Sequence, residues 1–170
     1  MNIRLVTKVA EQGDAVAQFD LGEAYEFGKG VQKDYIKAVE WYFKSAEQGY
    51  GKAQNVLGNC YYYGYGVEKN LSKMIYWHTL SAEQGYASAE CNMGINYFYG
   101  RGVQKDYIKA VEWLEKSAKH GNAKAQYQLG YCYENGLGTK VDYNKALFWI
   151  AKSAEQGYAD AIKALDLFED

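Results

Sequence analysis

The chain has 170 residues, 48% of them hydrophobic and 16% aromatic, and its 19 basic and 21 acidic side chains leave a formal net charge of −2. Such a balance provides no large field of one sign, so we expect neither nucleic acid nor an anionic membrane as a partner. No stretch approaches the roughly 20 apolar residues of a transmembrane helix, and we do not expect the basic start of the chain to act as a signal peptide. These features favour a cytoplasmic protein, or a periplasmic or secreted one if a signal peptide has been trimmed.

A tetrapeptide, Ala-Glu-Gln-Gly, recurs at a fixed distance of 36 residues. Its four intact copies and one altered copy, Ala-Lys-His-Gly, begin at Ala10, Ala46, Ala82, Ala118 (the altered copy) and Ala154. A fixed period of about 20–50 residues is typical of stacked structural repeats, which present long surfaces to partners and seldom carry a catalytic site. We expect the altered copy to be tolerated because it lies in an exposed turn.

The period divides residues 1–170 into one elongated repeat domain. Each repeat is predicted to contain two helices, helix A and then helix B. Residues 1–13 align with helix B alone and residues 158–170 with helix A alone; the full repeats between them are 14–49, 50–85, 86–121 and 122–157. In the last half repeat Asp166 and Glu169 replace the usual Gly and Tyr, as expected of a polar capping helix. The alternative is that the chain is a fragment of a longer protein.

Helix A, which covers residues 14–27 in the first repeat, is predicted from four recurring positions. Their first members are Ala17, Leu21, Gly22 and Tyr25. Equivalent residues follow every 36 positions, and their spacing places them on one helical face. A Gly inside a helix costs about 1 kcal/mol, so its recurrence indicates that another helix packs closely there. We expect the Ala, Leu and Tyr of this face to form the core.

A Gly-x-Gly turn follows helix A, and the side chain of an Asp or Asn is predicted to cap helix B. The first Gly of each turn suits the left-handed backbone at a helix C-terminus. The capping residues are Asp34, Asn70, Asp106 and Asp142. Helix B carries a Trp in each full repeat and is expected to end at the Gly of the tetrapeptide. Residues 31–41 and 103–113 are identical in sequence, which implies near-identical surroundings.

Written out, the repeat reads Ala-x3-Leu-Gly-x2-Tyr-x2-Gly-x-Gly-Val-x2-Asp-x2-Lys-Ala-x2-Trp, with a closing Ala-x2-Gly. This pattern covers essentially the whole chain and resembles the Sel-one-like repeat family, which is related to the tetratricopeptide repeats. The resemblance implies an all-α fold, a right-handed α-α superhelix (solenoid) of antiparallel helix pairs. It also implies a non-enzymatic scaffold or adaptor that holds a protein or peptide partner. Some bacterial members are immunity proteins that neutralise secreted toxins, and this is the alternative function.

The sequence contains no motif of a catalytic, metal or cofactor site. Cys60 and Cys132 occupy one position two repeats apart, too distant for a disulfide, and the chain lacks the paired Cys of the secreted branch of the family. Cys91 would need a positioned base to act as a nucleophile. The two histidines, His78 on helix B and His120 in the altered tetrapeptide, are expected to face solvent away from helix A. We predict no catalytic residue, no metal and no cofactor; a small-ligand binder or hydrolase, and a self-assembling array, are competing hypotheses.

The helix A face is predicted to line a concave groove, by analogy with tetratricopeptide arrays. Five exposed positions in each helix A vary between repeats while the Ala, Leu and Gly stay largely fixed, as expected of a surface fitted to an asymmetric partner. They are Val16, Phe19, Glu23, Glu26, Phe27, Lys52, Asn55, Asn59, Tyr62, Tyr63, Ser88, Cys91, Ile95, Phe98, Tyr99, Lys124, Tyr127, Tyr131, Glu134 and Asn135.

Aromatic anchors among polar groups are typical of protein-binding surfaces. We therefore expect a monomer that binds a protein or peptide on this face. The principal candidates lie at the ends of neighbouring A helices: Tyr62, Tyr63, Phe98 and Tyr99. The alternative is that some of these aromatic side chains pack between adjacent helices.

Overall fold

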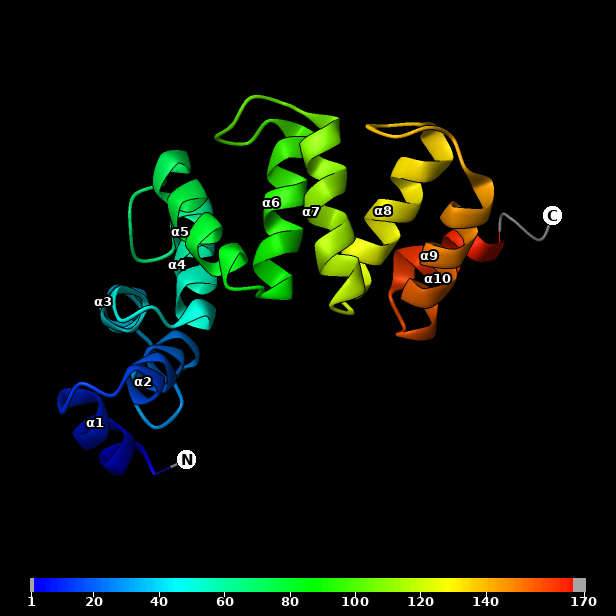
Figure 1. Ribbon diagram of the computed structural model, residues 1–170. Helices are drawn as coiled ribbons and strands as arrows, with labels where there is room; N and C mark the ends of the chain where they lie inside the picture. Colours follow the sequence, from blue (N-terminus) through cyan, green and yellow to red (C-terminus); the bar gives the residue numbers. More distant parts are fainter. Residues whose placement is uncertain (1, 167–170) are drawn as a thin grey trace. The chain divides into compact units, whose positions relative to one another are not determined.

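The structure, a computed structural model, describes residues 2–166, and this part of the chain contains ten α-helices and no β-strand. The helices are α1 (Ile3–Glu11), α2 (Ala15–Phe27), α3 (Tyr35–Glu47), α4 (Gly51–Tyr63), α5 (Leu71–Glu83), α6 (Ala87–Tyr99), α7 (Tyr107–Lys119), α8 (Ala123–Asn135), α9 (Tyr143–Glu155) and α10 (Ala159–Asp166). The even-numbered helices are the A helices. They begin 36 residues apart, so the all-α repeat predicted from the sequence is confirmed (Figure 1).

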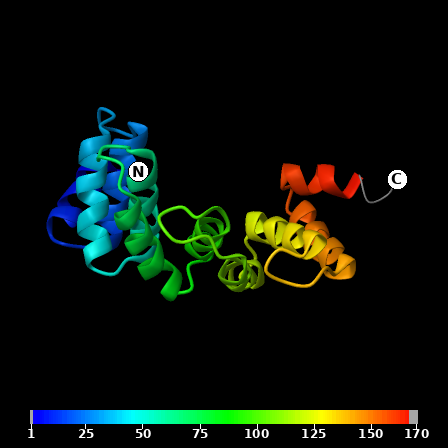
Figure 2. The same ribbon diagram turned by 90° about the horizontal axis from the view of Figure 1, so that it is seen from above.

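Two compact units divide the chain, Met1–Gln84 and Gly85–Asp170. In the first unit the helices from α1 to α5 pack each against the next, and in the second unit the helices from α6 to α10 do the same. An A helix and the B helix after it form an antiparallel pair, as α6 and α7 show in Figure 1. Helices α8 and α9 lie side by side in both views (Figures 1 and 2). The prediction of one elongated domain over 1–170 stays a prediction.

Side chains and glycines end the helices largely as the sequence predicts. At the start of α3, the Asp34 carboxylate accepts the backbone N–H of Ile36 at 3.0 Å and of Lys37 at 3.1 Å. The later B helices are capped in the same way by Asn70, Asp106 and Asp142. Left-handed glycines end the A helices at Gly28, Gly64, Gly100 and Gly136. The B helices end slightly earlier than expected, because the Gln or His of the tetrapeptide is the C-cap and its Gly follows.

The helix A glycines let the paired B helix approach closely, as predicted. A Cβ atom built on Gly22 would lie 2.6 Å from the ring of Tyr42, and one on Gly94 would lie 2.7 Å from Cγ of Leu114. Both distances are far inside van der Waals contact, so no larger residue fits without a shift of its neighbours. The Ala and Leu positions beside these glycines form the core, at most 8% exposed, at Ala17, Leu21, Ala53, Leu57, Ala89, Met93, Ala125 and Leu129.

The second Gly of the A–B turn has a separate role that the sequence alone does not reveal. In the first unit, the turn between α4 and α5 lies over the start of α3, and a Cβ atom on Gly66 would clash with the backbone carbonyl of Tyr35. Gly138 stands in the same relation to Tyr107 in the second unit. Because only a residue without a side chain fits there, these glycines let each turn rest directly on the preceding B helix.

Three tail residues, Leu167, Phe168 and Glu169, lie outside the described residues, and so does the side chain of Asp166. The predicted polar cap depends on these residues and stays a prediction. Helices in the described part have at most 13 residues, whereas about 20 are needed to cross a bilayer. Accordingly, no helix within residues 2–166 combines the length and hydropathy of a membrane span.

Candidate functional site

The recurring tetrapeptide, together with the Ser before it, holds helix B to the A helices on both sides. Ser45 Oγ donates to the backbone carbonyl of Ala15, the first residue of the preceding α2, at 2.6 Å. On the other side, Gln54 Nε2 of α4 donates to the carbonyl of Ala46 at 3.1 Å. The same Ser bond recurs at Ser81, Ser117 and Ser153. All four Ser are fully buried, so these bonds give the Ser and the Ala of the tetrapeptide a structural role, whereas the three residues after that Ala stay exposed.

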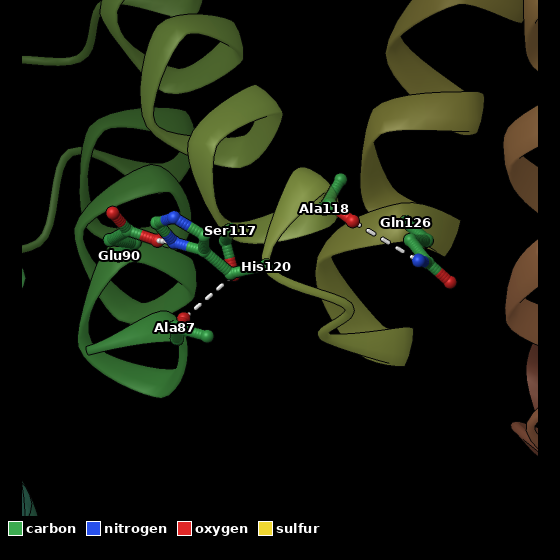
Figure 3. Close-up of polar contacts among 6 residues, drawn as sticks. All are labelled: Ala87, Glu90, Ser117, Ala118, His120 and Gln126. Atoms are coloured by element: carbon green, nitrogen blue, oxygen red, sulfur yellow. Dashed lines mark hydrogen bonds and ion pairs between the residues drawn. The ribbon is translucent and has the colours of Figure 1, made fainter. Parts of the chain in front are cut away.

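A pair of side chains completes this arrangement, and the third repeat replaces both members. In the first repeat, Gln48 Nε2 donates to Gln18 Oε1 at 2.7 Å, and equivalent Gln pairs recur in the second and fourth repeats. In the third repeat, Nδ1 of His120 lies 2.7 Å from Oε2 of Glu90 (Figure 3). Glu90 is only 2% exposed. The altered tetrapeptide is therefore matched by a second change on α6. Its turn, Lys119 to Gly121, is exposed as expected.

His78 is buried, contrary to the prediction that it faces solvent. It occupies the B-helix position that packs on the helix A Gly and that holds Tyr42, Leu114 and Ile150 in the other repeats. Its Nε2 lies 3.1 Å from Oδ1 of Asn59, and its ring also hydrogen-bonds the backbone of Asn55. Burial lowers the pKa of His78 from 6.5 to about 4, so the imidazole is neutral near neutral pH.

The buried His78 makes the stability of the protein depend on pH. Because its pKa is lower in the folded than in the unfolded chain, the unfolded chain binds more protons below pH 6.5. We expect His78 to cost about 1.4 kcal/mol of unfolding free energy per pH unit as the pH falls from 6.5 towards 4. Urea unfolding at pH 7, 6 and 5 measures this slope. His78→Leu, which copies Leu114, should flatten it, and an equal slope in both proteins would contradict the assignment.

Burial divides the twenty residues predicted to line the A-helix face. Eight are exposed: Val16, Phe27, Tyr63, Ser88, Tyr99, Lys124, Tyr131 and Asn135. Seven are half-buried: Glu23, Glu26, Lys52, Asn59, Tyr62, Tyr127 and Glu134. Exposure is a wrong prediction for the five that are buried, namely Phe19, Asn55, Cys91, Ile95 and Phe98.

Neighbouring residues cover the buried members of this face. The ring of Phe19 packs against Tyr42 of α3 and lies edge-on to Tyr50, which caps the next A helix, at 5.5 Å between centroids. The ring of Phe98 packs against Tyr107 of α7 at 5.0 Å. The interpretation that some of these aromatic residues pack between adjacent helices is thus confirmed for Phe19 and Phe98.

Polar side chains on the A helices of the first unit are engaged within the fold. Lys52 Nζ lies 3.8 Å from a carboxylate oxygen of Glu23 and 4.3 Å from the ring centroid of Phe19. The hydroxyl of Tyr42 donates to Glu26 at 2.5 Å. These contacts hold the polar groups in place beside the exposed aromatic residues and reduce the ordering that binding would require.

An exposed aromatic ring ends each of the first three A helices, and a side chain of the following turn covers it. The ring of Phe27 lies 4.8 Å below Lys29 Nζ, and Tyr99 lies 4.8 Å from the guanidinium of Arg101. In the second repeat the same place is taken by Tyr65, stacked on Tyr63 at 5.3 Å. These covering residues were not predicted from the sequence, although the middle position of each Gly-x-Gly turn varies visibly between repeats.

In the second unit, Tyr99 and Tyr131 each contact the same buried ring. Tyr99 ends α6 and Tyr131 lies on α8; both are exposed. The buried Phe98 contacts the ring of Tyr99 at 4.8 Å and that of Tyr131 at 6.3 Å. Tyr127 and Tyr158, also side by side at 5.5 Å, extend the aromatic surface towards α10. Tyr158 is a further residue that the sequence analysis missed.

The thiols have the properties of core residues. Burial raises the pKa of Cys60 and Cys132 to about 12 and that of Cys91 to about 11, so all three stay protonated near neutral pH. Within the part of the chain that the structure describes, no three His, Cys, Asp or Glu side chains are grouped to hold a metal ion.

The profile of the Sel1 repeat family matches residues 15–50, 51–86, 87–122 and 123–158. Each match begins one residue after the repeat predicted from the sequence, and the four cover most of the chain. The chain belongs to the Sel1 repeat family. Sel1 repeats generally mediate protein–protein interactions, so the exposed residues of the A helices are candidates for partner binding.

Solved structures of Sel1 repeat proteins superpose on the chain. The c5321 protein, a protective antigen of uropathogenic Escherichia coli strains with the SLR fold, matches 97% of this chain with 35% identity and a TM-score of 0.92. A Sel1 repeat protein from Oxalobacter formigenes matches 98% with 36% identity and a TM-score of 0.88. This chain spans 35% and 48% of the length of these two proteins. No curated protein matches the chain.

The immunity protein Pa5087 from Pseudomonas aeruginosa is a more distant structural neighbour. It matches 94% of this Sel1 repeat chain and 59% of its own length, with a TM-score of 0.65. At 24% identity this likeness shows a common fold only.

Proposed function

We propose that this Sel1 repeat protein is a non-enzymatic, monomeric scaffold or adaptor that binds a protein or peptide through the exposed residues of its A helices. The proposal depends on one observation: large aromatic side chains stay exposed at positions that vary between repeats. They are Phe27, Tyr63, Tyr99 and Tyr131. Tyr and Phe bury large areas at low cost in side-chain entropy, so they suit a surface fitted to a partner.

Buried residues of the predicted face support the proposal indirectly. Phe98 does not reach solvent, but it packs under both Tyr99 and Tyr131 and so fixes their rings. Lys29 and Arg101 cover Phe27 and Tyr99 in the same way. A surface whose aromatic anchors are already ordered loses less entropy on binding.

The chemistry of the described residues favours binding over catalysis. The three thiols are buried and protonated, which makes them poor nucleophiles. Each histidine has a structural partner, Asn59 for His78 and Glu90 for His120. A small-ligand binder or hydrolase is therefore the weaker hypothesis. The narrower alternative is an immunity protein that neutralises a secreted toxin by covering it with the same face.

Affinity capture from the source cell, with mass spectrometry, tests the proposal when wild type is compared with the variant Tyr63→Ala/Tyr99→Ala/Tyr131→Ala. We expect the variant to lose the partner, because a hot-spot side chain contributes about 2 kcal/mol or more, which is roughly 30-fold in Kd. Tyr143→Ala is the control, because Tyr143 is 64% exposed on the B helix α9. Capture by a triple variant with unchanged circular dichroism would place the site elsewhere. A captured toxin would select the immunity role.

A further inference from the structure

An apolar pocket opens beside the B helix α3 of the first unit, apart from the A-helix residues described above. Its walls are Ile36, Val39 and Phe43 of α3, and Gly66 and Val67 of the turn between α4 and α5. Ile36 is 63% exposed and Phe43 is 38% exposed, so apolar surface faces the opening. The volume of about 350 Å³ accommodates one large apolar side chain with part of its backbone.

Among the charged side chains around the pocket, Glu40 is an acid that forms no ion pair within the described part of the chain. Glu40 and Lys44 line the rim. The ammonium of Lys44 lies 3.9 Å over the ring of Trp41, and Lys37 is paired with Asp34 at 3.8 Å. Glu40 is exposed and forms no ion pair with any residue between 2 and 165. Glu40 is thus the rim group that can pair with a basic side chain, whereas the ammonium of Lys44 is held over Trp41.

The second unit contains the same helix start without the same walls. Residues 103–113 repeat residues 31–41, and Ile108 is 63% exposed, as Ile36 is. Two wall positions differ between the units: Glu115 replaces Phe43, and Thr139 replaces Val67. Glu115 accepts the hydroxyl of Tyr133 at 2.8 Å and so brings a charged group into the equivalent place. The chain therefore contains its own polar counterpart of the pocket.

We infer that the α3 pocket is a second docking site, which takes a peptide segment that presents a large aliphatic side chain next to a Lys or Arg. The aliphatic side chain fills the hollow between Ile36 and Phe43, where burial removes it from water. The basic side chain reaches Glu40 at the rim, and this contact gives the site its preference among apolar peptides. The lining of the pocket contains none of the exposed A-helix residues, so one protein can hold two segments.

Amide chemical shifts measured by NMR with three small probes test this inference. N-acetyl-Leu-Arg-amide is expected to shift the backbone amides of residues 36–44 and 66–67, with a Kd on the order of 1–10 mM. N-acetyl-Leu-Glu-amide should bind about 3-fold more weakly, because it lacks the partner of Glu40. N-acetyl-Ser-Arg-amide should leave these amides unchanged. Failure of the Leu-Arg probe to shift them at about 50 mM would overturn the inference.

Matched variants separate the pocket from the rest of the surface. Ile36→Ser should abolish the shifts, whereas Ile108→Ser, an equally exposed site in the identical segment, should preserve them. Glu115→Phe/Thr139→Val should create new shifts around residues 108–116. Equal loss in both Ser variants, or no gain in the double variant, would contradict a specific pocket. Light scattering adds one test: a dimer that Ile36→Ser dissociates would assign the pocket to a second copy and overturn the proposal.

Discussion

Gly66→Ala, which only adds a methyl group, should lower the free energy of unfolding of the first unit by about 2–5 kcal/mol. This is the largest effect that we expect from any substitution proposed here. Gly66 has φ +67°, where an L-residue costs about 1–2 kcal/mol. The added methyl group would also overlap the backbone carbonyl of Tyr35, which cannot rotate away as a flexible side chain does. Urea unfolding followed by circular dichroism at 25 °C measures the loss.

Gly49→Ala separates the two causes of this destabilisation. Gly49 also has positive φ, +87°, but a Cβ atom there meets nothing within 4 Å. Its substitution should therefore cost only the conformational term of about 1–2 kcal/mol. Equal losses in the two variants would show that the turn between α4 and α5 does not rest on α3 as closely as the structure has it.

His120→Ala should lower the free energy of unfolding by about 1.5–3 kcal/mol. This loss is larger than the loss expected when the Gln at the same position of an intact tetrapeptide is replaced by Ala. The substitution leaves the buried carboxylate of Glu90 without the ring nitrogen that lies 2.7 Å from it. In Gln84→Ala the buried partner is Gln54, a neutral amide that keeps its bond to the carbonyl of Ala46. We expect about 0.5–1.5 kcal/mol for this control. Urea unfolding compares the two variants.

A double substitution tests whether Glu90 and His120 form a matched pair. Glu90→Gln/His120→Gln recreates the Gln pair that Gln54 and Gln84 form in the second repeat. We expect Glu90→Gln and His120→Gln each to lower the free energy of unfolding, whereas the double variant should lie within about 0.5 kcal/mol of the natural protein, so the two changes are far from additive. Two independent losses that simply add would refute the pairing.

Much of the fold was predictable because local rules act at recurring positions. Asp34 caps α3 through its own neighbours, and Gly28 ends α2 through its own backbone, so neither depends on distant residues. Gly22 implied a close helix partner because a Gly is costly inside a helix. The contact between Glu90 and His120 could also have been predicted, since each replaces the Gln that the other repeats have at its position. The prediction requires that two positions 30 residues apart be compared together.

The candidate site was predicted less well, because its exposure depends on residues from other helices. Phe19 varies between repeats, as a binding residue does, but Tyr42 and Tyr50 cover it. His78 was expected to face solvent, away from helix A, whereas its position on the B helix faces a helix A Gly. Periodicity identifies the variable positions of a helix. It does not tell which of them a neighbouring helix covers.

The sequence by itself determined the repeat length, the starts and caps of the B helices, the glycines that end the A helices and the resemblance to the Sel1 family, because these follow from short-range spacing and backbone chemistry. Only the tertiary structure shows which variable side chains reach solvent and why no residue larger than Gly fits at position 66. It alone shows that Glu90 contacts His120 of the altered tetrapeptide. Each of these depends on contacts between residues of different helices, such as Glu90 and His120, which are 30 positions apart. Such contacts exist only once the helices have packed.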